Sequence, residues 1–212
     1  MTPPRKCEIQ RGRYTGQMKF RAFIAAEIDA NGDLRDLLTR LRRSGADLKV
    51  VRPELLHVTL KFLGDTDEGL VDEIASRMER AVQDIEPFSV RMLGMGAFPS
   101  LSNIRVVWVG MEDPDTMAEI ARRLDSSLDD LGFERDQKGF KAHLTIARAR
   151  SPAGMGAVQA ALKEKAASDF GTYRFGSIQL KKSTLSPQGP TYQTVREVPL
   201  GQSADGPTAG PS

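Results

Sequence analysis

The chain's only two histidines lie in segments with the same alternating pattern. The first segment is Leu56-His57-Val58-Thr59-Leu60, and the second is Ala142-His143-Leu144-Thr145-Ile146. Alternation of polar and aliphatic residues is typical of a β-strand that buries one face. Because side chains two residues apart share a face, each segment presents an imidazole beside a threonine hydroxyl. A fold of this chain must therefore supply a half-buried strand for each histidine.

Two imidazoles in matching settings are suited to acid/base catalysis. Histidine titrates near neutral pH, so a neutral ring can accept a proton while a charged ring donates one. An in-line displacement at phosphorus needs both, because one oxygen attacks as another leaves. The hydroxyls of Thr59 and Thr145 would donate hydrogen bonds to the phosphoryl oxygens, where negative charge grows. The pattern predicts a two-histidine site for phosphate chemistry, with no metal and no cofactor.

The histidines have two other interpretations. A single His-x-Thr in a strand is usually an edge residue or a hydrogen-bonded core histidine, but two matching copies favour a site. A zinc site is the second alternative. With Cys7 as the one cysteine, zinc would need carboxylates beside both histidines, and neither motif contains one. We therefore expect no metal ligands among these residues.

Composition narrows the class of protein. A chain of 212 residues, 40% hydrophobic and 27% charged, is typical of a soluble globular protein. Its net charge of +2 neither demands nor excludes nucleic acid as a partner. One cysteine cannot form an intramolecular disulfide, and no stretch is long and apolar enough to span a bilayer. We expect a cytoplasmic protein with no membrane partner.

Strand and helix patterns alternate between two polar ends. Residues 1–17 lack an apolar period, which predicts a flexible extension, and residues 201–212 lack large apolar side chains, which predicts a disordered tail. Strands are expected at 19–26, 48–51, 55–63, 88–98, 104–110, 139–149, 173–185 and 191–200. Apolar stripes predict helices at 34–41, 71–85, 117–131 and 156–167, the first capped by Asp29 or Asn31 and the second by Thr66 or Asp67.

Each half of the chain thus holds two helices, several strands and one His-x-Thr segment. This order favours an α+β fold of two lobes, in which two mostly antiparallel sheets face a central cleft and helices cover their outer faces. One histidine would come from each lobe, and the two would meet between the sheets.

Further motifs are shared with one protein family. They are Phe20-Arg21-Ala22-Phe23-Ile24-Ala25, Lys61-Phe62-Leu63-Gly64, Gly96-Ala97-Phe98-Pro99, Arg105-Val106-Val107-Trp108-Val109-Gly110, Ala147-Arg148 and Lys182-Ser183-Thr184-Leu185-Ser186-Pro187-Gln188-Gly189-Pro190-Thr191-Tyr192. With them and the histidine segments, the chain resembles the RNA 2′,3′-cyclic phosphodiesterases, also called 2′-5′ RNA ligases, of the 2H phosphoesterase superfamily. The resemblance covers about residues 18–200 and implies one bilobal domain there.

The resemblance implies metal-independent hydrolysis of an RNA terminal 2′,3′-cyclic phosphate to a 2′-phosphomonoester, with 2′-5′ RNA ligation as a related reaction. His57 would be the proton donor and His143 the proton acceptor that activates water. Thr59 and Thr145 would hold the phosphoryl oxygens. The implied partner is an RNA 3′ end, and we expect the protein to act as a monomer.

Two further family positions conflict with strict strand alternation. Arg148 would bind phosphate and Phe62 would stack on a base, but alternation places both on the face opposite the histidines. They reach the site only if a bulge or a strand end turns them; otherwise Arg148 is a surface ion-pair residue and Phe62 a core residue. Lys181 and Lys182 supply positive potential or solvate a strand end, and Tyr192 contacts a base or forms a structural corner. None of these three joins the predicted catalytic set.

Two other functions are compatible with the sequence. The substrate could be a small cyclic phosphate, such as a nucleoside 2′,3′-cyclic phosphate, in place of RNA. The chain could also be a non-catalytic RNA-binding module, although the intact histidine pair argues against this. Comparing turnover of mononucleotides and oligonucleotides distinguishes these functions, because extra RNA contacts raise the rate only for an RNA enzyme.

Overall fold

The structure is a computed structural model that describes residues 18–186 and 189–201. Apart from Gly201, the two ends predicted to be flexible, 1–17 and 201–212, lie outside these residues. The strands are β1 (Lys19–Glu27), β2 (Leu48–Val50), β3 (His57–Asp67), β4 (Phe88–Ser100), β5 (Asn103–Met111), β6 (Leu144–Ala149), β7 (Asp169–Phe175), β8 (Ser177–Ser186) and β9 (Gly189–Pro199). The helices are α1 (Gly32–Arg42), α2 (Val71–Val82), α3 (Asp115–Ser127) and α4 (Met155–Glu164).

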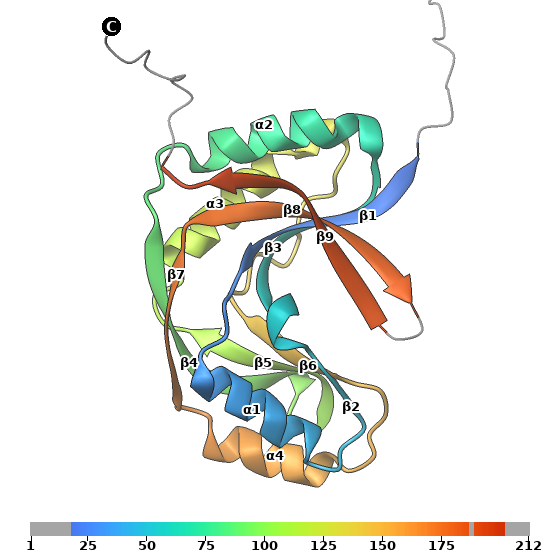
Figure 1. The fold of residues 1–212 in the computed structure, drawn as a ribbon, viewed down its shortest axis with the longest axis vertical. Coiled ribbons are helices and arrows are strands. Elements are labelled where there is room, and N and C mark those ends of the chain that lie inside the picture. Colours follow the sequence, from blue (N-terminus) through green and yellow to red (C-terminus); the bar gives the residue numbers. More distant parts are fainter. Residues whose placement is uncertain (1–17, 187–188, 202–212) are drawn as a thin grey trace, which may run out of the picture.

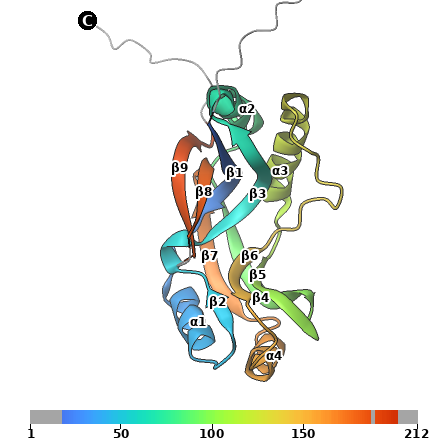
Figure 2. The same cartoon turned by 90° about the vertical axis from the view of Figure 1, so that its right-hand side faces the viewer.

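The strands form two sheets in which neighbouring strands are antiparallel. The four-stranded sheet has the order β3-β1-β8-β9, and the five-stranded sheet has the order β2-β6-β5-β4-β7. Helices α2 and α3 pack at one end of the molecule against β9 and β3, while α1 and α4 pack at the opposite end against β2, β7 and β4 (Figures 1 and 2). The predicted α+β fold with two antiparallel sheets and outer helices is confirmed.

The two sheets do not correspond to the two halves of the chain, which corrects the prediction of one lobe per half. The four-stranded sheet joins β1 and β3 to the last two strands, β8 and β9. The five-stranded sheet includes β2 from near the N-terminus, and α1 packs on that sheet. The order of strand and helix patterns does not reveal which strands pair, because pairing depends on tertiary packing. Each sheet nevertheless carries one histidine segment, on β3 and at β6.

Local signals predicted the helices well. The predicted stripe of α1 is buried, and the Asn31 side chain caps the helix by accepting a hydrogen bond from the Leu34 amide at 3.0 Å. Asp67 accepts one from the Gly69 amide at 2.8 Å, so it caps the 3₁₀ turn that precedes α2 and not α2 itself. Apolar residues from both sheets and from α1 to α4 form one continuous core. Within the described residues, no helix has the length and apolar character needed to cross a membrane.

Three of the predicted strands differ from the structure by more than two residues at an end or are divided, and the others differ by two residues at most. The strand expected at 139–149 begins only at Leu144, so His143 immediately precedes β6. The strand expected at 173–185 divides at Gly176 into β7 and β8, which belong to different sheets. The strand expected at 55–63 begins at His57, after a 3₁₀ turn that starts at Pro53, and it continues to Asp67. Proline favours the first position of a helical turn because its φ angle is fixed.

Candidate active site

Both histidine rings are held in the same way, by the carbonyl group two residues earlier. Nδ1 of His57 lies 2.8 Å from the Leu55 carbonyl oxygen, and Nδ1 of His143 lies 2.6 Å from the Lys141 carbonyl oxygen. Because a carbonyl oxygen only accepts, Nδ1 of each ring carries a proton and donates it. Nε2 of a neutral ring is then a proton acceptor, and Nε2 of a charged ring is a proton donor. Both rings are therefore fixed with the same nitrogen available for proton transfer.

His57 belongs to an aromatic cluster on the open face of the four-stranded sheet, meaning the face turned away from the helices. Its ring centroid lies 5.0 Å from that of Phe23 on β1 and 5.2 Å from that of Tyr192 on β9. Burial lowers the pKa of His57 from its ordinary value of 6.5; the hydrogen bond to Leu55 raises the pKa, and the charge of Lys181 lowers it further. The protein without ligand therefore favours the neutral form of this ring.

His143 packs edge-on against Phe98 of β4, with ring centroids 5.2 Å apart. The Phe98 ring lies 5.3 Å from that of Trp108 on β5. The indole crosses directly over Gly96, where an added Cβ would lie 2.1 Å from the nearest ring carbon. Nε1 of Trp108 is buried without a hydrogen-bond partner in the described part of the chain, and Trp108 is the cross-strand neighbour of Thr145. A glycine at position 96 is therefore needed to seat the aromatic pair that supports His143.

A bulge in β3 determines where Phe62 points. The pairing of β3 with β1 shifts register at Leu60, and both Leu60 and Lys61 are buried on the helix side of the sheet. Phe62 then comes opposite Phe23, on the same face as His57. Its side chain is 72% exposed, so it is not a core residue.

A second bulge, in β6, acts in the same way on Arg148. Thr145 and Ala147 pair with consecutive residues of β5, which leaves Ile146 as an extra residue. Ile146 and Ala147 are both fully buried, so Arg148 returns to the face of Thr145, where it is exposed. Strict alternation would have placed Arg148 on the opposite face.

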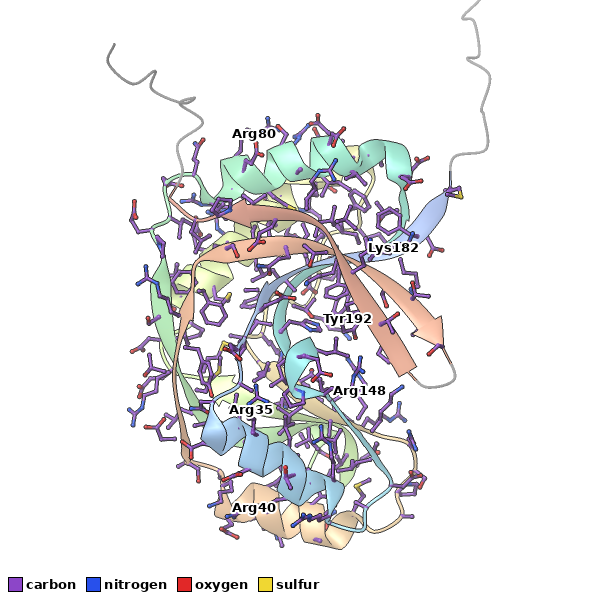
Figure 3. The ribbon with its side chains drawn as sticks, in the orientation of Figure 1. Arg35, Arg40, Arg80, Arg148, Lys182 and Tyr192 are labelled. Carbon is purple, nitrogen blue, oxygen red and sulfur yellow. The ribbon has the colours of Figure 1, made fainter. Side chains whose placement is uncertain are left out.

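The charge of Arg148, on the five-stranded sheet, acts on two residues of the four-stranded sheet. Burial lowers the pKa of His57 and raises that of Tyr192, and in both cases the nearby charge of Arg148 contributes a lowering, although Arg148 belongs to the other sheet. Strands β3 and β6 also contact each other directly. Figure 3 shows Tyr192 and Arg148 between the two sheets. Arg148 of the five-stranded sheet therefore lies near His57 and Tyr192 of the four-stranded sheet.

Thr59 and Thr145 lie on the open faces of their sheets. Thr59 is opposite Ala25 of β1, and Thr145 is opposite Trp108 of β5. Both threonines are half-buried. Each sheet therefore carries one histidine and one threonine of the predicted set.

An ion pair beside His57, between a buried lysine and an exposed glutamate, could not be foreseen from the sequence. Lys181 is 5% exposed, pairs with Glu27, and donates a hydrogen bond to Thr194 at 2.7 Å. Glu27 is the cross-strand neighbour of His57. Lys182 points to the other face, where its Nζ lies 5.2 Å from the centre of the Phe20 ring. The two adjacent lysines thus have different environments, and only the position of β8 beside β1 reveals this.

An acidic cavity of about 450 Å³ lies near the site but is not lined by either histidine. Four carboxylates and two arginines line it, including Glu27 and Glu197, so it is unfavourable for phosphate. Among the residues that the structure describes, no group of three or more His, Cys, Asp or Glu side chains could hold a metal ion. The histidine pair, and not this cavity, defines the candidate site.

The fold and the paired His-x-Thr segments define a two-histidine phosphoesterase class. The chain belongs to the 2'-5' RNA ligase superfamily, whose family model matches residues 30–182. The RNA 2',3'-cyclic phosphodiesterase of Methanothermobacter thermautotrophicus is 37% identical over 179 residues, which are 82% of this chain and 96% of the relative. The protein of the same name from Archaeoglobus fulgidus is 34% identical over 179 residues, which cover 83% and 98% of the two chains.

Solved structures agree with this assignment. The Thermus thermophilus protein TT0787 superimposes with a TM-score of 0.70 at 26% identity, covering 86% of this chain and 98% of that one. E. coli LigT complexed with 3'-AMP has the same fold, with a TM-score of 0.68 at 22% identity and coverage of 87% and 100%.

Proposed function

We propose that this protein hydrolyses the terminal 2′,3′-cyclic phosphate of RNA to a 2′-phosphomonoester, by a two-histidine mechanism that needs no metal. The proposal is supported by the pair of imidazoles, each anchored by the carbonyl group two residues earlier and each beside a threonine, and by Arg148 of one sheet lying close enough to His57 of the other to lower its pKa. A histidine that only fills a core has no reason to repeat this arrangement on a second sheet. The names of the relatives at 34% and 37% identity support the same activity.

The chemical step is a displacement at phosphorus. A water oxygen bonds to phosphorus, and Nε2 of neutral His143 accepts the proton that the water loses. The bond between phosphorus and the 3′ oxygen breaks, and Nε2 of charged His57 donates a proton to that oxygen. The phosphate remains on the 2′ oxygen. With a 5′-hydroxyl in place of water, the same step forms a 2′-5′ linkage.

This division of roles requires His57 to be charged when the substrate is bound. Burial lowers the pKa of His57 in the free protein, so the neutral form is favoured before binding. A negatively charged phosphodiester beside the ring favours the charged form, and substrate binding therefore promotes the donor state. The opposite assignment, with His57 as acceptor and His143 as donor, has the lowered pKa of His57 in its favour.

The remaining residues bind the substrate. The hydroxyls of Thr59 and Thr145 donate hydrogen bonds to the two non-bridging oxygens, stabilising the charge of the transition state. Arg148 binds the phosphate with its guanidinium group, and its position between the sheets supports this role. Phe62, exposed on the histidine face, offers a ring on which the terminal base can stack.

The decisive experiment measures product formation from an oligoribonucleotide that ends in a 2′,3′-cyclic phosphate, in the presence of a chelator. We expect a 2′-phosphate product and a bell-shaped dependence of kcat/KM on pH. His57→Ala and His143→Ala should each lower kcat by about 10²- to 10⁴-fold, with a smaller effect on KM, and Thr59→Val should lower it less. Lys163→Ala, on the exposed side of α4, is the control.

Three results would redirect the proposal. Full activity in either histidine variant would remove that histidine from the mechanism. Binding of the oligonucleotide without turnover by the unmodified protein would favour the non-catalytic RNA-binding module. Faster turnover of a mononucleotide than of the oligonucleotide would favour the small cyclic phosphate as substrate.

A further inference from the structure

Lys49 is a second cation beside Arg148, on a strand to which the sequence assigned no role. Lys49 of β2 is directly opposite Arg148 of β6, and paired residues of neighbouring strands point to the same face. Lys49 therefore lies on the open face of the five-stranded sheet, where it is half-buried. The two cationic side chains start from strands about 4.8 Å apart.

The ammonium group of Lys49 reaches from the five-stranded sheet to the β8–β9 hairpin of the other sheet. A Cβ atom added at Gly189 would lie 2.5 Å from Nζ and 2.8 Å from Cε of Lys49. Gly189 is buried and has a φ angle of +130°, a conformation that favours glycine. Lys49 thus lies between Arg148 of its own sheet and Gly189 of the other sheet.

Neither of these two cations has an acidic partner in the described part of the chain. No carboxylate lies within 4.0 Å of Lys49 or Arg148, whereas Arg91 and Arg123 each contact two carboxylates. Two adjacent positive charges repel each other, and a half-buried ammonium loses part of its hydration. An anion bound between the sheets would relieve both effects.

Resting on the function proposed above, we propose that Lys49 binds the internal phosphate that precedes the terminal nucleotide of the RNA substrate. Along β6, Thr145 lies nearest to His143, Arg148 follows at the far end of the bulge, and Lys49 lies one strand beyond. A phosphate held by the histidines and Arg148 leaves Lys49 for the next phosphate of the chain. Lys49 is then a specificity residue, because a mononucleotide has no internal phosphate to offer it.

The test compares a nucleoside 2′,3′-cyclic phosphate with a trinucleotide that has the same cyclic end. We expect Lys49→Ala to lower kcat/KM for the trinucleotide by about tenfold, the effect of losing one charge-assisted phosphate contact, and to affect the mononucleotide at least about five times less. Lys49→Arg should keep most of the preference for the trinucleotide. Lys163→Ala controls for the loss of one positive charge elsewhere.

A binding measurement keeps the inference separate from the catalytic proposal. The dissociation constant of a trinucleotide that ends in a 2′-phosphate should rise about tenfold in Lys49→Ala, and the slope of log affinity against log salt concentration should fall by about 0.7. If the unmodified protein turns over neither cyclic substrate, the catalytic proposal fails, and this binding result alone decides the role of Lys49. Equal losses for mononucleotide and trinucleotide, or no loss for either, would overturn the inference.

Discussion

Replacing Gly96 by alanine should disturb His143 from a distance, through two aromatic rings. The new methyl group would lie 2.1, 2.4 and 2.7 Å from three carbons of the Trp108 indole, so the ring must retreat by about 1.3 Å to reach ordinary contact at 3.4 Å. Trp108 packs on Phe98, and Phe98 packs on His143, so the retreat moves the support of the imidazole. Overpacking of this kind costs about 2 kcal/mol, and a misplacement of about 1 Å lowers the rate by up to about 10²-fold.

The fluorescence, the thermal midpoint and kcat of Gly96→Ala test this prediction. Trp108 is the only tryptophan, so its fluorescence reports the displacement directly. The thermal midpoint of Gly96→Ala should fall by about 4–8 °C, and kcat on a cyclic phosphate should fall by at least about tenfold. The matched control is Gly156→Ala in α4, where an added Cβ meets nothing within 4 Å. This change should leave fluorescence and kcat near the values of the unmodified protein, and it should not lower stability, because alanine favours a helix more than glycine does.

A double-mutant cycle separates the clash from other effects of the new methyl group. Trp108→Leu removes the ring that the methyl group would strike, so adding Gly96→Ala to this variant should cost at least about 1 kcal/mol less than it costs alone. Equal fluorescence and equal kcat in Gly96→Ala and Gly156→Ala would contradict this prediction. It is also refuted if the two substitutions are additive.

Three further predictions concern charge. Burial lowers the pKa of His57 below 6.5, so the contribution of the neutral ring to the free energy of unfolding is complete above pH 6.5 and is lost as pH falls toward the lowered pKa. In urea unfolding, His57→Gln should therefore lose less stability than the unmodified protein between about pH 7.5 and 5.5. Arg148→Ala should raise the pKa of His57, followed by NMR of the imidazole, and should raise KM; an unchanged KM would count against phosphate binding. Lys61→Met breaks the 2.5 Å pair with Asp125, in which Lys61 is 4% exposed, and should destabilise the fold by about 3 kcal/mol; a loss below about 1 kcal/mol in urea unfolding would contradict this.

Strand alternation and helical periodicity predicted local features of the fold around the histidine segments. Alternation placed His57 and Thr59 on one face of β3, because a period of two is a local property of the backbone, whereas His143 lies just before β6. The stripe of α1 and its Asn31 cap were local signals of the same kind. These features required no knowledge of which strands are neighbours.

The positions of Arg148 and Phe62 could not be predicted in the same way. Each depends on a bulge, at Ile146 or at Leu60, that exists only in relation to the neighbouring strand. Family resemblance singled out both residues, while alternation alone pointed them away from the histidines. The contact between Lys49 and the β8–β9 hairpin depends on sheet order for the same reason.

The edge-to-face contact between Tyr192 and His57 has a consequence for synthesis on the ribosome. In the four-stranded sheet β8 pairs with β1 and β9 pairs with β8, so one edge of β1 stays unpaired until β8 has been synthesised. A chain arrested before residue 192 would contain both imidazoles and every proposed phosphate ligand, but its His57 ring would lack the contact with Tyr192. Such nascent fragments should stay inactive until Tyr192 has been synthesised and β9 has paired.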